Sequence, residues 1–307
     1  MSTAGRAAGV ALAVFGGTMV SLQSRINGEL AARVHSGIFA AVISFGSGLL
    51  ILAVAVGVFR RARAGLSRVK ALLSQGRLRW WECIGGACGA LVVASQGLTV
   101  GALGVSVFIV ALVAGQSVSS LFVDRAGLAP GGRRPITPTR TAGTVLTVVA
   151  VVIAVSTHMG TPTTLALAVL PLLGGAASAW QSAMNGRVRQ ASGGVLPTTF
   201  INFVVGTTAL VIAFVLWGAP FAPLPPQAWL YVGGILGMSF IGIAVAVVRH
   251  IGVLLLGLAM IAGQVAGAVA IDALVPGGAG TPTAATLTGA ALTLVAVAIA
   301  TWTPRRS

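Results

Sequence analysis

Acidic side chains are almost absent from this sequence of 307 residues, which has only Glu29, Glu82, Asp124 and Asp272. Charged residues of both signs make up 7% of the chain, whereas a soluble domain carries about 25%. So few charges cannot cover a water-exposed surface, and 56% of the residues are hydrophobic. The composition therefore excludes a soluble globular domain and predicts an all-α polytopic membrane protein whose surroundings are the lipid bilayer.

The side-chain groupings that support catalysis are missing as well. Cys83 and Cys88 are the only thiols, and five residues apart on a helix they point to different faces, so neither a structural disulfide nor a zinc site is predicted. The sequence has no nucleophile–base arrangement and no phosphate-binding Gly-x-x-x-x-Gly-Lys motif. We therefore expect no enzyme activity, no cofactor, no metal and no direct use of ATP.

Positive charge is the exception, because nineteen Lys and Arg residues give a net charge of +15. The basic residues lie between apolar runs without interleaved aromatic side chains, so no nucleic-acid partner is predicted. If the apolar runs cross the membrane, 17 of the 19 basic residues fall on one side, and only Arg25 and Arg33 on the other. Positive charge collects on cytoplasmic loops. We therefore expect a multi-pass protein of the bacterial inner (plasma) membrane with both termini in the cytoplasm.

Ten apolar runs are long enough to cross a hydrocarbon core of about 30 Å. They are Ala7–Asn27, Gly37–Phe59, Trp80–Val100, Gly104–Val123, Thr141–Thr157, Thr164–Asn185, Leu196–Trp217, Ala228–Val248, Gly252–Leu274 and Ala285–Thr303. The basic segment between the second and third runs is expected to be a loop.

A short polar motif occurs twice at a constant spacing. Gly16-Gly17, Gln23-Ser24 and Asn27-Gly28 return 158 residues later as Gly174-Gly175, Gln181-Ser182 and Asn185-Gly186. A second block repeats with a shift of 148, which relates Gly115-Gln116 to Gly263-Gln264 and Asp124 to Asp272. Each half then holds five crossings, an odd number, so the halves must enter the membrane in opposite senses. The sequence predicts ten transmembrane helices as two inverted five-helix repeats, residues 1–158 and 159–307.

This arrangement resembles the drug/metabolite transporter superfamily. The paired Gln-Ser-x-x-Asn-Gly motifs, with a Gly-Gln pair in the fourth and ninth runs, resemble its YdcZ-like branch of bacterial inner-membrane proteins. The resemblance implies a transporter fold with a central cavity between the halves, and it implies no particular substrate.

Polar side chains inside the apolar runs are candidates for binding a small-molecule substrate. A Gln and an Asn four residues apart share one helical face in each copy of the motif, and such groups cost free energy in hydrocarbon unless they find partners. The predicted substrate-binding residues are Gln23, Asn27, Gln116, Trp180, Gln181, Asn185 and Gln264. The alternative for the amides is that they join helices. Trp180 is expected to form an aromatic wall for an apolar or flat substrate, and the alternative is that it faces lipid. Gln96 and Asn202 are further amides without a match in the other half.

Charged residues are expected to have structural roles. Arg25 and Glu29 share a face near the outer end of the first run, which favours a local ion pair or an Arg25 side chain that extends to the membrane surface; recruitment of an anionic substrate is the alternative. Asp124 and Asp272 are expected to bind basic groups or backbone amides. No acidic, His or Lys residue lies near the centre of a run, which disfavours proton exchange with a cationic drug. We expect a secondary transporter for a small neutral, zwitterionic or weakly charged metabolite, working by export or facilitated exchange. A channel-like pore and a non-transporting membrane scaffold remain alternatives, and a homodimer is left open.

Overall fold

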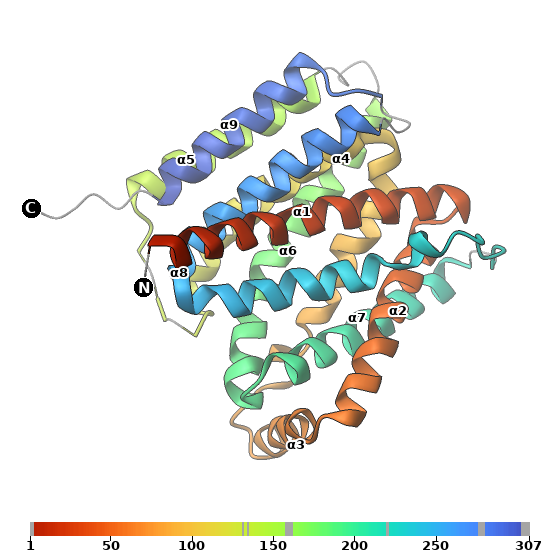
Figure 1. Ribbon diagram of the computed structural model, residues 1–307, viewed down its shortest axis with the longest axis vertical. Coiled ribbons are helices and arrows are strands. Elements are labelled where there is room, and N and C mark those ends of the chain that lie inside the picture. The colour runs from red at the N-terminus through yellow and green to blue at the C-terminus, as the bar shows by residue number, and fades with distance from the viewer. Residues whose placement is uncertain are drawn as a thin grey trace, which may run out of the picture.

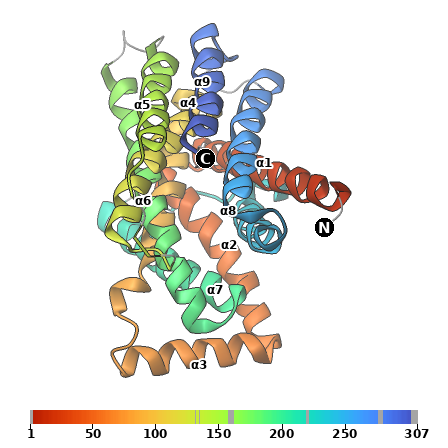
Figure 2. The ribbon, with the colours of Figure 1, turned by 90° about the vertical axis from the view of Figure 1, so that its left-hand side faces the viewer.

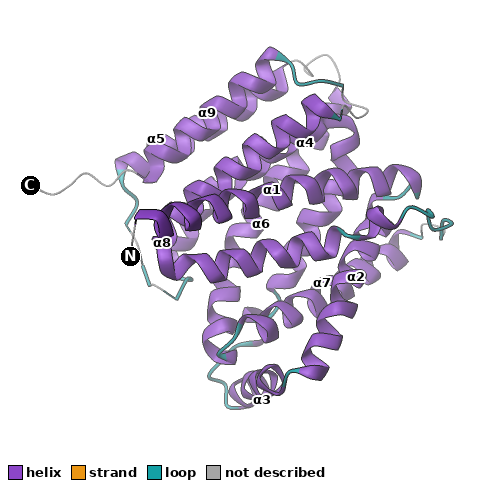
Figure 3. Ribbon diagram, in the orientation of Figure 1, coloured by secondary structure: helices purple, strands orange, loops and turns teal. Residues whose placement is uncertain are grey.

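The computed structural model describes residues 3–130, 132–133, 135–156, 162–218, 221–275 and 280–301, and this part of the chain is all-helical, as predicted (Figure 3). The helices are α1 (Thr3–Arg33), α2 (Gly37–Val58), α3 (Arg60–Ser74), η1 (Trp80–Glu82), α4 (Gly85–Ala126), α5 (Pro138–Val155), α6 (Pro162–Ser192), α7 (Val195–Trp217), η3 (Ala228–Tyr231), α8 (Gly233–Leu274) and α9 (Ala284–Thr301).

Seven stretches among the described residues are long and apolar enough to cross a membrane, and two apolar helices are shorter. One stretch, Trp80–Ala126, has 47 residues, more than twice the roughly 20 that one crossing needs. It contains the third and fourth predicted runs, joined in α4 and separated only by Gly104, whose φ of 77° and ψ of 165° interrupt the helix. The eighth and ninth runs are likewise contained in η3 and α8, and the cyan and blue parts of α8 run in different directions (Figure 1). The ten predicted crossings are therefore not ten separate helices.

Helix α3 was not predicted, because the basic segment was expected to be a loop. It lies across the end of the bundle, roughly perpendicular to its long axis (Figure 2). Its buried residues are Ala62, Gly65 and Val69, which recur every three to four positions and form one small apolar face. A Cβ atom added at Gly65 would lie 2.9 Å from the backbone oxygen of Ser192, so this face packs closely on the end of α6.

The two halves of the chain pack through pairs of helices, each pair with one helix from each half. Helix α1 lies along α8, and α6 lies along α4, while α2 pairs with α7 and α5 with α9. A Cβ atom at Gly17 would overlap the backbone oxygen of Met260, and one at Gly175 would overlap that of Leu112. The glycines in these two contacts are related by the shift of 158 and the carbonyl residues by the shift of 148. The repeats in the sequence thus reappear as matching close contacts between the long helices.

Helices α5 and α9 lie side by side against one face of the bundle (Figure 1). They cover the largest hydrophobic core, which is formed by the second part of α4, from Val105 to Ala114, with contributions from α5, α8 and α9. Phe108 and Ile109 in this segment are completely buried. This core holds the second part of α4 in place beside the polar residues that follow it.

Candidate functional site

A cavity of about 200 Å³ lies among helices α1, α2, α4, α6, α7 and α8. Its polar lining consists of seven amide side chains and two serines: Gln23, Gln96, Gln116, Gln181, Asn185, Asn202, Gln264, Ser178 and Ser182. Its apolar lining consists of Val20, Phe45, Val92, Val93, Leu112, Phe203, Phe240 and Ile241, with Gly89 and Gly237. Among the described residues, the lining includes no Asp, Glu, His, Lys or Arg, so polar amides and apolar side chains share an uncharged surface.

Much of this lining consists of residues related by the sequence repeats. Gln23 and Gln181 line it from α1 and α6, and Gln116 faces it together with its counterpart Gln264. A Cβ atom at Gly237 would lie 2.9 Å from the Gln23 amide nitrogen. A Cβ atom at the equivalent position, Gly89, would lie 2.6 Å from the Gln181 amide nitrogen. Glycine at both positions therefore leaves the space that the two glutamine side chains occupy.

Five of the seven predicted site residues line the cavity: Gln23, Gln116, Gln181, Asn185 and Gln264. Asn27 does not, because it is completely buried beside the cavity. Trp180 does not either. It packs with Trp81, Leu128 and Ala129 around Val123 and Met184, so Trp180 lies against protein and does not form the predicted aromatic wall of this cavity.

In the first half, the buried amides form a network between α1 and α4. The Asn27 side-chain nitrogen donates to the Gln96 amide oxygen at 2.6 Å, and the Gln96 nitrogen donates to the Ser24 hydroxyl at 3.0 Å. Both polar atoms of the Gln96 side chain therefore have partners. The network explains why an amide is tolerated here although only 1% of Gln96 is exposed.

In the second half, the repeat-related amides form their hydrogen bonds with a different helix. The Gln181 nitrogen donates to the Asn202 oxygen at 3.0 Å, and the Asn202 nitrogen donates to the Asn185 oxygen at 2.6 Å. Here α6 is tied to α7, whereas α1 is tied to α4 in the first half. Gln96 and Asn202, which ranked below the paired amides in the sequence, are thus the central residues of the two networks.

Other amides that face the cavity have no protein partner for at least part of their polar surface. The side-chain oxygen of Gln264 is buried and accepts no hydrogen bond from the described residues, and Gln264 as a whole is only 6% exposed. Gln23 and Gln116 form no side-chain hydrogen bond within the described part of the chain. These three glutamines can therefore bind another molecule without breaking an existing contact.

The aromatic part of the lining was missed by the sequence reasoning. The rings of Phe45 and Phe203 stack with centroids 4.8 Å apart, and Phe240 lies on the same cavity. A usable signal was present, because Phe45 and Phe203 are separated by 158 residues, as are Gly48 and Gly206. Each of these glycines leaves space for the phenylalanine of the other half, since a Cβ atom there would overlap the ring.

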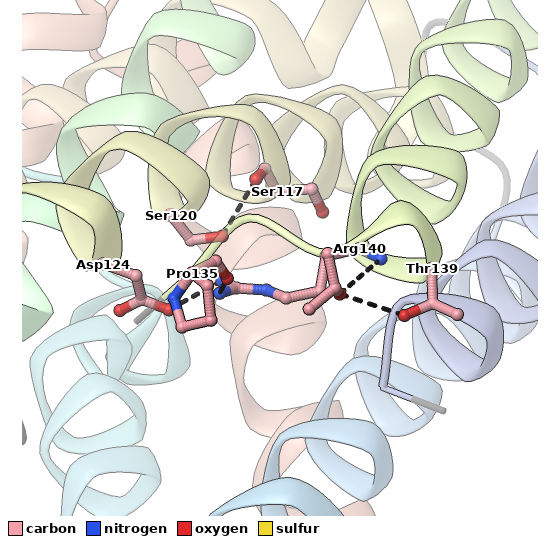
Figure 4. A network of polar contacts seen from close by, with 7 residues as sticks. Ser117, Ser120, Asp124, Pro135, Thr139 and Arg140 are labelled. Atoms are coloured by element: carbon pink, nitrogen blue, oxygen red, sulfur yellow. Dashed lines mark hydrogen bonds and ion pairs between the residues drawn. The ribbon is translucent and has the colours of Figure 1, made fainter. Parts of the chain in front are cut away.

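The charged residues lie outside the cavity lining and serve the scaffold. Asp124 pairs with the Arg140 guanidinium at 2.6 Å (Figure 4), and both Asp272 oxygens accept backbone N–H groups, from Val105 at 3.0 Å and Ser106 at 2.7 Å. This agrees with the structural roles predicted for the two aspartates. Glu29 pairs with Arg33 at 3.0 Å rather than with Arg25, so an ion pair between Arg25 and Glu29 is not formed. Both arginines lie four residues from Glu29, and the order with the acid N-terminal to the base favours Arg33.

Comparison with known families gives the chain a place among transporters. The family model described as "Putative inner membrane exporter, YdcZ" matches residues 8–153 and again residues 166–299. The chain belongs to the YdcZ family. The double match falls on the two stretches that the repeat analysis separated, and the family supports an inner-membrane transport function for this multi-pass protein rather than an enzymatic one. No curated protein matches the chain.

A solved structure agrees with this fold. One crystal structure, described only as "Crystal structure of protein", covers 97% of this chain and 97% of its own, with a TM-score of 0.52 and 17% sequence identity. At this identity the likeness concerns the arrangement of helices alone, and it extends over nearly the whole YdcZ-family chain.

Proposed function

We propose that this YdcZ-family chain is a secondary transporter of the bacterial inner membrane that carries a small neutral, zwitterionic or weakly charged metabolite. The observation that carries the proposal is the cavity, which is lined by repeat-related glutamines from both halves and enclosed by six helices. Transporters built from inverted repeats place their binding site where the repeats meet. An amide-lined chamber at such a junction is therefore the expected place for cargo.

The lining restricts the chemistry of the cargo. Gln264 has a buried oxygen without a hydrogen-bond donor, and an unsatisfied buried acceptor is costly, so a ligand with an N–H or O–H group would be favoured there. The absence of charge in the lining favours a cargo with little net charge. A volume of about 200 Å³ lies below the range of about 300–1,000 Å³ of most ligand pockets, which restricts the cargo to a small molecule. The Phe45 and Phe203 rings add an apolar surface.

Movement of cargo would follow from the two halves acting as units. We propose that residues 1–158 and 159–307 form these units, that they enter the membrane in opposite senses, and that both termini are cytoplasmic. Rocking of one unit against the other would expose the cavity to each side in turn. Export or facilitated exchange then depends on the gradient of the cargo.

A binding screen on purified protein tests the proposal. A library of neutral and zwitterionic metabolites is screened for thermal stabilisation, and each hit is measured again on Gln264→Ala and Gln116→Ala. We expect both variants to lower the affinity about tenfold or more, the equivalent of losing one or two hydrogen bonds. Gln75→Ala, an exposed glutamine at the end of α3, is the matched control and should bind as the parent does. Hits that bind equally well to all three variants would place the binding site elsewhere.

Reconstituted protein separates transport from its alternatives. A carrier gives saturable counterflow of the hit between liposomes and medium, a pore gives steady conductance in a planar bilayer, and a scaffold gives neither. Counterflow is the expected result.

A further inference from the structure

The two copies of the polar motif differ in their exposure, although the sequence makes them equivalent. In α1, Gln23 is 8% exposed and Ser24 and Asn27 are completely buried. In α6, the corresponding Gln181 and Asn185 are only half-buried and Ser182 is exposed. Ser182 and Asn185 line the cavity, whereas Ser24 and Asn27 do not. We refer to the end near Asn27, where the motif side chains are fully buried, as the closed end of the cavity, and to the end near Asn185, where they are partly exposed, as the open end.

The closed end is held by contacts between α1 and the first part of α4. Gln96 accepts from Asn27 and donates to Ser24, and one turn further along α4 Val100 packs on Gly28. A Cβ atom at Gly28 would lie 2.9 Å from a methyl carbon of Val100. Both α1 and α4 must therefore stay in register for this end to remain closed.

Gln96 is also the residue that breaks the symmetry between the halves. The shift of 148 places Ala244 at the equivalent position of α8, and alanine cannot form a side-chain hydrogen bond. In the second half the amide partner of Asn185 is Asn202, on α7, where the first half has Ser44. The hydroxyl of Ser44 has no partner among the described residues. Thus side-chain hydrogen bonds of the motif join α1 to α4 in the first half and α6 to α7 in the second half.

We propose that Gln96 is a latch that closes the Asn27 end of the cavity. Opening that end requires α1 to separate from α4, which breaks both hydrogen bonds of the Gln96 amide. Gln96 borders the cavity, but both polar atoms of its side chain are bound to Asn27 and Ser24, so its role in the latch is that of a positioning residue. The inference rests on the proposed function, since it assigns a residue to one of the two cavity openings that alternating access requires.

Thiol accessibility at Val100 reports whether this end is open. In a Cys83→Ser, Cys88→Ser background, Val100→Cys is labelled with a membrane-impermeant maleimide in lipid nanodiscs, where both faces are in contact with solvent. Val100 is 3% exposed, so labelling of the parent should be slow. Gln96→Met keeps the side-chain volume but removes both hydrogen bonds, and we expect it to accelerate labelling about tenfold. Ser24→Ala removes one hydrogen bond and should accelerate it about threefold.

Two controls separate the latch from general loosening. Asn202→Leu removes the corresponding amide of the second half and should leave labelling at Val100→Cys unchanged. Ala111→Cys lies in the fully buried core of α4 and should stay unlabelled in every variant. If Gln96→Met does not accelerate labelling at Val100→Cys, or if Asn202→Leu accelerates it equally, Gln96 is not the latch. If Ala111→Cys is labelled in the protein that carries Gln96→Met, that variant has unfolded. Faster labelling of Val100→Cys in Ser24→Ala then supports the latch, and unchanged labelling overturns it.

The labelling experiment needs no cargo, so its result is independent of the metabolite screen. A negative labelling result overturns the latch and leaves the proposed transport function standing. A working latch in a protein that neither binds nor moves any metabolite would instead count against the proposed function.

Discussion

Single glycines decide how closely the helices of this protein approach one another. Gly175 of α6 faces the backbone of α4, where an added Cβ atom would overlap the carbonyl oxygen of Leu112 and lie 2.8 Å from the Gln116 nitrogen. Backbone atoms cannot turn away as a flexible side chain can. The position of Gln116 in the cavity therefore depends on Gly175, a residue that has no side chain.

We predict that Gly175→Ala lowers stability by about 1–3 kcal/mol, because the extra methyl group overpacks the helix contact. Gly46→Ala on α2, where no atom lies within 4 Å of the added Cβ, should be neutral or slightly stabilising, since alanine is the better helix former. Thermal unfolding of both variants in the same detergent checks this. Equal melting temperatures for the two variants would mean that α4 and α6 are not in close contact.

The amide side chains around the cavity were predicted only in part from the sequence. The repeat selected Gln23 and Gln181 because a conserved spacing within one chain is a strong signal. It also selected Asn27, which is buried in a network instead of facing the cavity. The difference depends on Gln96, which approaches from another helix, and no pattern along α1 records that approach.

At the scale of elements, the break in α4 at Gly104 depends on a distant aspartate. The N–H groups of Val105 and Ser106 begin the second part of α4, where the preceding helix offers them no acceptor. Asp272, at the end of α8, accepts from both and is itself 5% exposed. A carboxylate at a helix N-terminus is also favoured by the helix dipole. The break is thus stabilised by the repeat-related half of the molecule.

We predict that Asp272→Ala destabilises the protein by about 1–3 kcal/mol or more, because it leaves two buried N–H groups without an acceptor. The repeat-related Asp124→Asn is the control. The ion pair of Asp124 with Arg140 is partly buried, with 22% exposure of both side chains, and the carbonyl oxygen of asparagine can still accept the hydrogen bond from Arg140, so a smaller loss is expected. Chemical unfolding followed by circular dichroism compares the two. A larger loss for Asp124→Asn would contradict this account of the break.

Helix α3 is an element that the charge pattern of the sequence does not predict. Seven basic residues between positions 60 and 79 indicate a cytoplasmic segment, and that indication says nothing about its secondary structure. The small residues Ala62, Gly65 and Val69 carry the helical period, but they are weakly hydrophobic and stand among charged neighbours. Their significance depends on the end of α6, which supplies the surface on which they pack.

For the whole molecule, the central expectation is that the halves face opposite ways in the membrane. Helix α1 packs along α8 of the other half, and α6 packs along α4 of the other half, which is consistent with an approximate twofold axis between the halves. The direction of this axis relative to the bilayer is to be measured. With five crossings per half, α3 and the segment between α7 and η3 belong to opposite sides.

We predict that Ser67→Cys on α3 and Leu224→Cys between α7 and η3 are labelled from opposite sides of the membrane in the cysteine-free background. Both side chains are exposed, Leu224 by 61%, so labelling is not limited by burial. Impermeant thiol reagents applied to intact cells and to inside-out vesicles make the comparison. Labelling of both positions from the same side would exclude ten crossings.

A second prediction at this scale concerns protons. Because the lining residues that the structure describes include no titratable side chain, cargo binding and release should not involve proton uptake at an intramembrane carboxylate. We expect counterflow in liposomes to vary by less than about twofold between about pH 6 and pH 8, and an imposed pH gradient should not drive accumulation. Accumulation driven by a pH gradient would require a titratable group outside this lining.

The sequence by itself determined the class of protein, the repeat and most of the cavity glutamines, because apolar length, charge and spacing are properties of the chain alone. Only the tertiary structure decided that α4 carries two predicted runs around Gly104, that Trp180 packs away from the cavity, and that Gln96 and Asn202 fasten the two motif copies to different helices. These outcomes depend on which side chain of another helix satisfies a buried polar group, and partners of that kind are chosen by packing in three dimensions rather than by separation along the sequence.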